Sequence, residues 1–239
     1  LAHWDSQDWR RVPYPHEKPV KLNGMAFRSS RDGWLVGEYN SPDTSWNRQV
    51  GVVYHWDGKT WTQSGPMWDE ALNGVAVFGE HAWAVGTGGL LLHWDGAAWK
   101  EMVSPVRNTL YEDFAHRFSL NSIQMLSKDE GWAAGGVPYN IPGMAVILHY
   151  KDGVWTKVYD SESDNLWMDL ASIHMLSASQ GWATGSGESF SPGYLLHWDG
   201  QAWHIETKAV DMIHAVTAGG QTAWAGGHEN FLRWDGRTW

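Results

Sequence analysis

Residues 92–99 read Leu-His-Trp-Asp-Gly-Ala-Ala-Trp: an apolar residue, then His93-Trp94-Asp95-Gly96, then a second tryptophan, Trp99. Close variants of this phrase occur six times along the chain. The fourth copy has Tyr-Lys where the others have Trp, and the sixth has Arg in place of His. The copies span residues 2–9, 54–61, 92–99, 148–155, 196–203 and 232–239.

A second phrase, of the form Gly-Trp-Ala-x-Gly, alternates with the first. Its copies lie at residues 33–37, 82–86, 131–135, 181–185 and 223–227. Self-similarity at roughly 40–50 residues is typical of a repeat architecture in which each repeat is one supersecondary unit. The repeated residues are therefore expected to be mostly structural.

The second repeat shows the unit most clearly. Residues 72–78 alternate as a strand does, 79–81 form a turn, and 82–86 are a second short strand. Residues 90–94 form a third strand, Asp95-Gly96 is a tight turn, and Trp99 lies on a fourth strand. Four short antiparallel strands repeated radially describe the blade of an all-β β-propeller, and no stretch shows a helical period.

We therefore predict a single β-propeller domain over residues 1–239. It has five full four-stranded blades and an N-terminal hairpin, residues 1–12, that belongs to a further blade. The first strand of each blade is expected to line the central channel. The blades are expected at about 21–64, 70–103, 118–158, 169–206 and 210–239.

Each repeated residue has a structural interpretation. The turn aspartate accepts hydrogen bonds from backbone N–H groups two residues on, and the glycine tolerates a positive φ. The tryptophan after the turn is expected to point into the space between blades, where its flat ring covers much apolar area. The repeated histidine is expected to face the neighbouring blade and form an inter-blade hydrogen bond, because the third strands are too far from the channel for a shared metal.

With these motifs the chain resembles the Asp-box (BNR-like) propeller repeats, and it is similar to the photosystem II stability and assembly factor propellers. It departs from the Asp box by lacking the leading Ser and one residue before the Gly. The Trp-Asp pair also resembles WD repeats, without their Gly-His dipeptide. The five-bladed tachylectin, a sugar-binding propeller, is similar in size and repeat number. The resemblance implies the fold, whereas propellers host many unrelated functions.

The N-terminal copy corresponds to only the last two strands of a blade, and Trp239 is expected to end a fourth strand. Propellers close by pairing N-terminal with C-terminal strands, so ~20 residues or more are expected to be absent, with six or seven blades in the complete molecule. The alternative is a five-bladed ring with the extra hairpin packed outside.

Composition excludes several function classes. The chain of 239 residues carries a net charge of -10, which argues against nucleic acid and anionic membranes because both need a basic patch. It has no cysteine, which excludes disulfides and thiolate chemistry, and its apolar runs are too short to span a bilayer. The lack of cysteine suits an exported protein, and we expect an extracytoplasmic location: secreted, periplasmic or at the cell surface.

Function is expected in the segments that do not repeat. Long second-to-third-strand loops at 38–51, 136–144 and 186–193, and long blade connections at 105–117 and 160–166, are expected to emerge on one face of the propeller. Variable loops on a rigid scaffold are where binding usually occurs. The opposite face is expected to carry short, uniform turns.

Aromatic residues gather in these loops, together with carboxylates. They can cap the propeller end, form the core of a protein interface, or stack on sugar rings. The candidate binding residues are Tyr39, Trp46, Trp68, Tyr111, Phe114, Tyr139, Trp167, Phe190 and Glu188.

One loop carries a weak calcium pattern. Asp160, Glu162 and Asp164 place oxygen ligands at alternate positions, as a calcium loop begins. Calcium needs six or more oxygens, and an EF-hand loop has Gly sixth and Glu twelfth, where this chain has Asn165 and Ala171. A solvated acidic connection is the competing interpretation, so we expect no cofactor apart from this calcium candidate.

The sequence favours binding over catalysis. A sialidase on such a propeller needs three clustered arginines, whereas only Arg28 lies on a channel-side strand; no catalytic triad or phosphate loop is visible. We predict a non-catalytic scaffold or accessory subunit that docks a protein partner, within a larger complex, through the long-loop face. The alternatives are a lectin-type carbohydrate-binding propeller and, third, a glycosidase-like enzyme with paired carboxylates.

Overall fold

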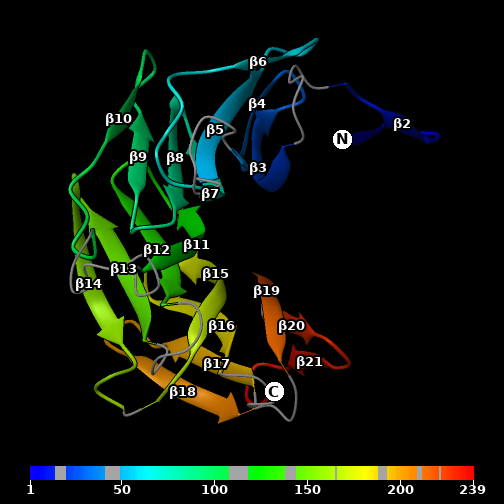
Figure 1. The fold of residues 1–239 in the computed structure, drawn as a ribbon. Helices are drawn as coiled ribbons and strands as arrows, with labels where there is room; N and C mark the ends of the chain where they lie inside the picture. The colour runs from blue at the N-terminus through cyan, green and yellow to red at the C-terminus, as the bar shows by residue number, and fades with distance from the viewer. Residues whose placement is uncertain are drawn as a thin grey trace.

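The computed structural model describes residues 1–13, 20–40, 49–107, 118–137, 144–164, 166–187, 193–208, 212–220 and 222–239. These residues form β-strands in six antiparallel sheets and contain no helix. Figure 1 shows the sheets following one another along an arc. Among the described residues, no helix is long and apolar enough to cross a membrane.

The sheets follow chain order, and five of them are the predicted blades. The N-terminal hairpin pairs β1 (Ala2–Trp4) with β2 (Trp9–Arg11). Blade 1 comprises β3 (Lys21–Ser29), β4 (Asp32–Asn40), β5 (Gln49–Trp56) and β6 (Trp61–Gln63). Blade 2 comprises β7 (Leu72–Phe78), β8 (His81–Gly86), β9 (Leu91–Trp94) and β10 (Trp99–Glu101).

The remaining blades continue the arc. Blade 3 comprises β11 (Ser119–Met125), β12 (Glu130–Gly136), β13 (Ala145–Lys151) and β14 (Val154–Asp160). Blade 4 comprises β15 (Asp169–Ser177), β16 (Gln180–Ser186), β17 (Gly193–Trp198) and β18 (Trp203–Lys208). Blade 5 comprises β19 (Ile213–Gly219), β20 (Thr222–Gly227) and β21 (Phe231–Trp234).

The first strands β3, β7, β11, β15 and β19 lie side by side along the inner edge of the arc (Figure 1). The later strands of each blade extend outward from them, in the order of the chain. This radial arrangement of antiparallel sheets is a β-propeller, so the predicted fold class is confirmed.

Blade 5 differs from the prediction in having three strands in the described residues. In blades 1 and 2 the fourth strand begins at the tryptophan after the Asp-Gly turn, Trp61 or Trp99. The equivalent residue in blade 5, Trp239, is the last residue of the sequence. Within the described residues Trp239 forms no strand, so the fourth strand of blade 5 stays a prediction.

The final glycine of the Gly-Trp-Ala-x-Gly phrase has a packing reason. It lies on the second strand, opposite the residues at which the first strand of the same blade begins. A Cβ added at Gly135 would lie 1.9 Å from the Ser119 carbonyl oxygen, and one at Gly185 would lie 2.0 Å from that of Asp169. Gly86 makes the same approach to Ala71, at 2.0 Å. Only glycine permits this backbone contact.

The Asp-Gly turns adopt the predicted geometry. Asp57 Oδ1 accepts hydrogen bonds from the backbone N–H groups of Lys59 and Thr60, both at 2.8 Å. Gly58 has φ of +92°, in the region that favours glycine. Asp95, Asp199 and Asp235 accept the equivalent pairs of bonds.

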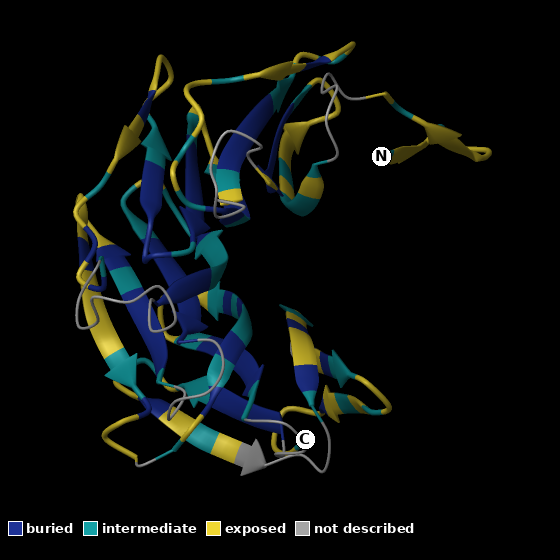
Figure 2. Ribbon diagram, in the orientation of Figure 1, coloured by how far each residue is buried: buried dark blue, intermediate teal, exposed yellow. Residues whose placement is uncertain are grey.

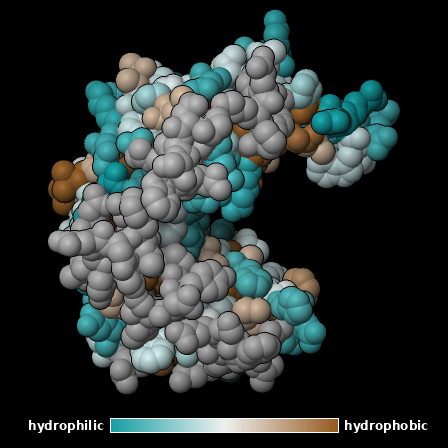
Figure 3. All heavy atoms as spheres, viewed as in Figure 1, coloured by the Kyte–Doolittle hydropathy of each residue, from teal (hydrophilic) through white to brown (hydrophobic). Residues whose placement is uncertain are grey.

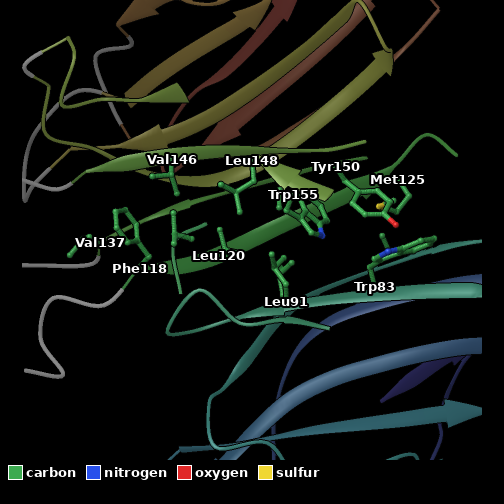
Figure 4. Close-up of a cluster of buried hydrophobic side chains, with 14 residues drawn as sticks. Trp83, Leu91, Phe118, Leu120, Met125, Val137, Val146, Leu148, Tyr150 and Trp155 are labelled. Carbon is green, nitrogen blue, oxygen red and sulfur yellow. The ribbon is translucent and has the colours of Figure 1, made fainter. Parts of the chain in front are cut away.

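The hydrophobic core lies between blades, and Figure 2 shows buried residues concentrated in the middle of the arc. Figure 4 shows the junction of blades 2 and 3, where Trp83 and Leu91 of blade 2 point toward Leu120, Tyr150 and Trp155 of blade 3. The tryptophans after the turns of blades 2 to 5 point between blades, as predicted: Trp99, Trp155, Trp203 and Trp239 each pack against the preceding blade.

His55, His93 and His149 form side-chain hydrogen bonds within their own blade, so the inter-blade bonds predicted for these three histidines were wrong. His55 Nε2 lies 3.2 Å from Asp32 Oδ1, and His149 Nε2 lies 3.3 Å from Glu130 Oε1. The pleat directs each histidine onto the second-strand tryptophan of the same sheet: the rings of His149 and Trp132 stack with centroids 4.1 Å apart. The hydrogen-bond partner of each of these histidines is therefore a residue on the neighbouring second strand.

Asparagines on the first strands join successive blades along the channel. Asn23 donates to the Leu72 carbonyl at 2.9 Å, and Asn73 donates to that of Leu120 at 3.0 Å. Each of these asparagines occupies a β-bulge, which leaves its side chain directed at the next blade. In blade 4 the same bulge position holds Ala171, so this bond is missing between blades 4 and 5.

Candidate functional site

The long-loop face is the end of the propeller where second strands finish and first strands begin. Backbone bridges tie blades together there: Gly51 pairs with Trp68, and Thr87 pairs with Ser119. These bridges hold the bases of the loops in fixed positions. The loop residues 41–48, 108–117, 138–143 and 188–192 lie outside the described residues. So do six of the predicted binding residues: Trp46, Tyr111, Phe114, Tyr139, Phe190 and Glu188.

Tyr39 and Trp68 lie in packed positions on this face. Tyr39 is buried, and its hydroxyl donates to Met67 Sδ at 2.7 Å. Trp68 packs partly against the core between blades 1 and 2, and its backbone exchanges two hydrogen bonds with Gly51, at 2.8 and 3.0 Å. These two aromatic residues therefore anchor the connection between blades 1 and 2, which is the capping role.

Trp167 is the described candidate whose ring remains accessible. It lies between β14 and β15 with 51% of its surface exposed, and the next residue, Met168, is buried. The anchoring of Met168 in the core fixes the position of Trp167. Met67, in the equivalent connection between blades 1 and 2, is 53% exposed. Two apolar side chains on this face are thus available for contact.

Three carboxylates stand at the strand ends of the same face; we call Glu38, Glu70 and Asp169 the acidic rim. Glu38 is buried and accepts a hydrogen bond from Lys21 Nζ at 2.9 Å. Glu70 accepts a hydrogen bond from Thr87 Oγ1 at 3.0 Å. Each carboxylate belongs to a different part of the arc and has its own donor.

Asp169 is the rim residue whose carboxyl has a shifted pKa. Burial raises the pKa of its carboxyl to about 6, and the hydrogen bond from Asn121 opposes that rise. A Cβ at Gly136 would lie 2.8 Å from Asp169 Oδ1 and 2.9 Å from the Met144 carbonyl oxygen, so glycine at this position leaves room for the carboxylate.

The rim carboxylates are thus enclosed, with Glu38 paired with Lys21 and Glu70 lying 3.7 Å from Arg107. Met67 and Trp167, in contrast, are exposed apolar side chains on this face.

The repeat pattern did not predict that Glu38 or Asp169 would be part of the site. Both residues lie in strands of the repeat, and nothing in the sequence showed that their carboxyl groups are enclosed. A usable signal existed for the channel asparagines, since Leu-Asn-Gly recurs at 22–24 and 72–74 and Leu-Asn-Ser occurs at 120–122. A polar residue at a fixed offset in a buried strand indicates a specific hydrogen bond.

Two of the three calcium candidates, Asp160 and Asp164, are engaged with other partners. Asp160 accepts from Ser163 Oγ at 3.0 Å and pairs with Lys157 Nζ at 2.9 Å. Asp164 accepts from the Tyr159 hydroxyl at 2.9 Å. Within the described ranges, no three His, Cys, Asp or Glu side chains gather as a metal site. The structure does not bring Asp160, Glu162 and Asp164 together.

Arg28 lies at the opposite end of its strand from the long-loop face. It forms ion pairs with Asp32 and Glu80, and it donates to the Gly79 carbonyl at 3.1 Å. These contacts join blades 1 and 2 beside the short turns. Arg28 therefore has a structural role and is remote from the acidic rim.

Comparisons with known proteins support the fold. No protein-family model matches the chain, and no curated protein matches its sequence. Among solved structures, the chain is similar to YCF48 from Cyanidioschyzon merolae, with a TM-score of 0.58 and 16% identity over 91% of this chain and 66% of that one. It is also similar to a chain of a nidogen/laminin complex, with a TM-score of 0.55 and 11% identity over 85% of this chain and 71% of that one.

A further similar structure is PorZ of Porphyromonas gingivalis, a bacterial surface component of the type-IX secretion system. Its TM-score is 0.57, with 14% identity over 95% of this chain and 34% of that one. The chain thus spans 66% of the YCF48 chain and 34% of PorZ. At these identities the likeness establishes the propeller fold alone.

Proposed function

We propose that this protein is a non-catalytic, extracytoplasmic binding scaffold or accessory subunit that docks a protein partner through its long-loop face. The observation that carries the proposal is that two apolar side chains in connections on that face, Met67 and Trp167, are 53% and 51% exposed. Aromatic residues and Met are enriched at the centres of protein interfaces, and polar groups surround them.

The difference between the two ends of the propeller supports this choice. The short-turn end repeats the same Asp-Gly geometry in blade after blade. The connections at the other end differ in length and sequence, and we propose that together they offer one composite surface. A lectin propeller repeats its sugar site in each blade, and this asymmetry favours a single protein interface.

Two of the similar solved structures accord with a binding role. One comes from a nidogen/laminin complex, and PorZ is a surface component of a secretion system. A partner with a basic surface patch would complement the net charge of -10. We propose such a partner for the long-loop face.

The proposal is tested by co-purification from the native source, followed by light scattering and by binding measurements with the captured partner. A Trp167→Ala variant is expected to lose at least tenfold in affinity while keeping its thermal stability. Phe78→Ala is the matched control, because Phe78 is also exposed but lies at the short-turn end. Equal affinities for all three proteins would contradict docking at this face.

The carbohydrate alternative makes a different prediction for the same residue. If Trp167 stacks on a sugar ring, the purified chain binds glycans on an array and Trp167→Ala abolishes that binding. Glycan binding without any protein partner would replace the scaffold proposal with the lectin one.

A further inference from the structure

Blade 2 departs from its neighbours at one repeat position, the residue that lies beside the third-strand histidine. In blades 1 and 3 this residue is a carboxylate, Asp32 or Glu130. In blade 2 it is a second histidine, His81, and its Nδ1 lies 3.0 Å from Nε2 of His93. The repeat thus places two imidazoles together where it otherwise pairs an imidazole with a carboxylate.

The pairing of β8 with β9 brings these two histidines together. His93 lies directly opposite Trp83 in the register. His81 lies two residues before Trp83 and therefore on the same face of β8. Diagonal neighbours on one face of an antiparallel pair are within reach of each other when their side chains are long. Both imidazoles therefore stand on a rigid element of the blade.

Trp83 forms a common floor beneath both imidazoles. Its ring centroid lies 5.8 Å from that of His81 and 4.9 Å from that of His93. Trp83 is itself 1% exposed and belongs to the core between blades 2 and 3. Side chains that rest on a fixed surface lose less rotamer freedom when they bind a ligand. The pair is therefore preorganised.

The pair is accessible from solvent. Both histidines are only partly buried. Figure 3 shows a largely hydrophilic surface at the end of the arc where the turn after β9 lies in Figure 1. Burial, more than the neighbouring His81, lowers the pKa of His93, so this ring is neutral at pH 7.5. An ion in solution can thus reach neutral imidazole nitrogens.

The spacing of the two nitrogens suits a metal ion. Imidazole nitrogen binds Zn²⁺ at about 2.0–2.1 Å, so two such ligands in tetrahedral geometry stand roughly 3.3 Å apart. The observed 3.0 Å is close to this separation. In the free pair one ring donates its N–H to the other. When the ion enters, each ring turns its lone pair toward it, and that proton moves to the outer nitrogen of its own ring.

We infer that His81 and His93 together bind one divalent transition-metal ion of the Zn²⁺ type, with water in the remaining coordination positions. In the part of the chain that the structure describes, no third His, Cys, Asp or Glu gathers with them as a metal site. Imidazole ligands select Zn²⁺, Ni²⁺ and Cu²⁺ over Ca²⁺ and Mg²⁺, which require oxygen ligands. The bound ion links β8 to β9 beside the short turns, and the site is separate from the long-loop face.

Titration calorimetry of the full chain with Zn²⁺ tests the site. The parent chain is expected to bind one ion, and His81→Gln is expected to bind it at least tenfold more weakly. Gln180 occupies the equivalent position in blade 4, so the blade accommodates this substitution. His149→Gln is the matched control, because His149 is a third-strand histidine whose partner is a carboxylate. This control is expected to bind Zn²⁺ as the parent does.

Two further measurements identify where the ion lies. Zn²⁺ is expected to shift the imidazole NMR signals of both His81 and His93 in the parent chain, a result that needs no variant. It is also expected to raise the unfolding temperature of the parent and of His149→Gln, and to have little effect on His81→Gln, because a ligand that binds the folded state stabilises it. The absence of saturable binding by the parent up to about 1 mM Zn²⁺ would overturn the inference. Equal affinities in the parent and His81→Gln would also overturn it, because the ion would then be held elsewhere.

Discussion

Asn121 of blade 3 donates hydrogen bonds to both carboxylate oxygens of Asp169 in blade 4, at 3.1 and 3.2 Å. The same amide reaches the Leu170 carbonyl at 2.9 Å. The bonds join the channel strands of two blades at the edge of the long-loop face. The acidic rim is therefore connected directly to the first-strand asparagines that hydrogen-bond successive blades to one another.

Asp169 is expected to make stability depend on pH. Its pKa of about 6 in the folded chain lies above the usual value of 3.8, so between these values the folded chain holds a proton that the unfolded chain releases. The free energy of unfolding therefore falls as pH rises from about 4 to 6, by up to about 3 kcal/mol, and stays level above that window.

Asp169→Asn is expected to remove this slope and to raise the free energy of unfolding at pH 7. Urea unfolding at several pH values measures both effects. Asp199→Asn is the control, because backbone hydrogen bonds lower the pKa of that exposed turn residue to about 2, and its contribution is lost only at lower pH. An unchanged slope in Asp169→Asn would show that another group titrates.

The first-strand asparagines that join successive blades predict opposite effects on the free energy of unfolding at two positions. Asn73→Ala is expected to cost about 1–3 kcal/mol of unfolding free energy, because the Leu120 carbonyl loses its donor. Ala171→Asn is expected to add about 1 kcal/mol by bonding blade 4 to blade 5. Denaturant unfolding measures both variants. Destabilisation by Ala171→Asn would mean that this bulge does not orient its side chain as the others do.

The close approach of strands predicts a severe effect for one glycine. Gly135→Ala is expected to cost about 3 kcal/mol, because its Cβ would lie 1.9 Å from a backbone carbonyl oxygen. Gly219→Ala provides the comparison, since no atom lies within 4 Å of a Cβ there. Thermal unfolding is the measurement, and similar shifts in the two variants would contradict the packing account.

A tryptophan of the repeat and a tryptophan of a loop are expected to contribute differently to the free energy of unfolding. Trp132→Ala removes a fully buried ring from the junction of blades 3 and 4 and is expected to cost about 3–5 kcal/mol. Trp167→Ala is expected to cost less than about 0.5 kcal/mol because its ring is half exposed. Guanidinium unfolding compares them, and a large loss in Trp167→Ala would assign it a capping role.

The fold could be predicted from the sequence because its determinants are local and repeated. The turn aspartates, the positive-φ glycines and the inter-blade tryptophans act over a few residues and recur in register. The histidine partners could not be predicted in the same way. Asp32, His81 and Glu130 differ in residue type, and only the pleat shows that they lie beside the third-strand histidines.

The candidate site was predicted less completely, for a physical reason. Trp167 and Trp68 lie in similar connections, yet one ring is half exposed and the other packs on the core. The enclosure of Asp169 depends on Asn121, a residue 48 positions away. Sequence spacing carries no information about such long-range burial. The remaining loop candidates stay predictions.

The most direct test of the scaffold proposal is cross-linking mass spectrometry on the protein in its native extract. Lys21 and Lys157 lie toward the long-loop face, whereas Lys59 and Lys128 lie at the short turns. The account predicts cross-links from Lys21 and Lys157 to one basic partner, at least severalfold more abundant than those from Lys59 and Lys128. A partner joined mainly through Lys59 and Lys128, or a chain that remains an unlinked monomer, would contradict it.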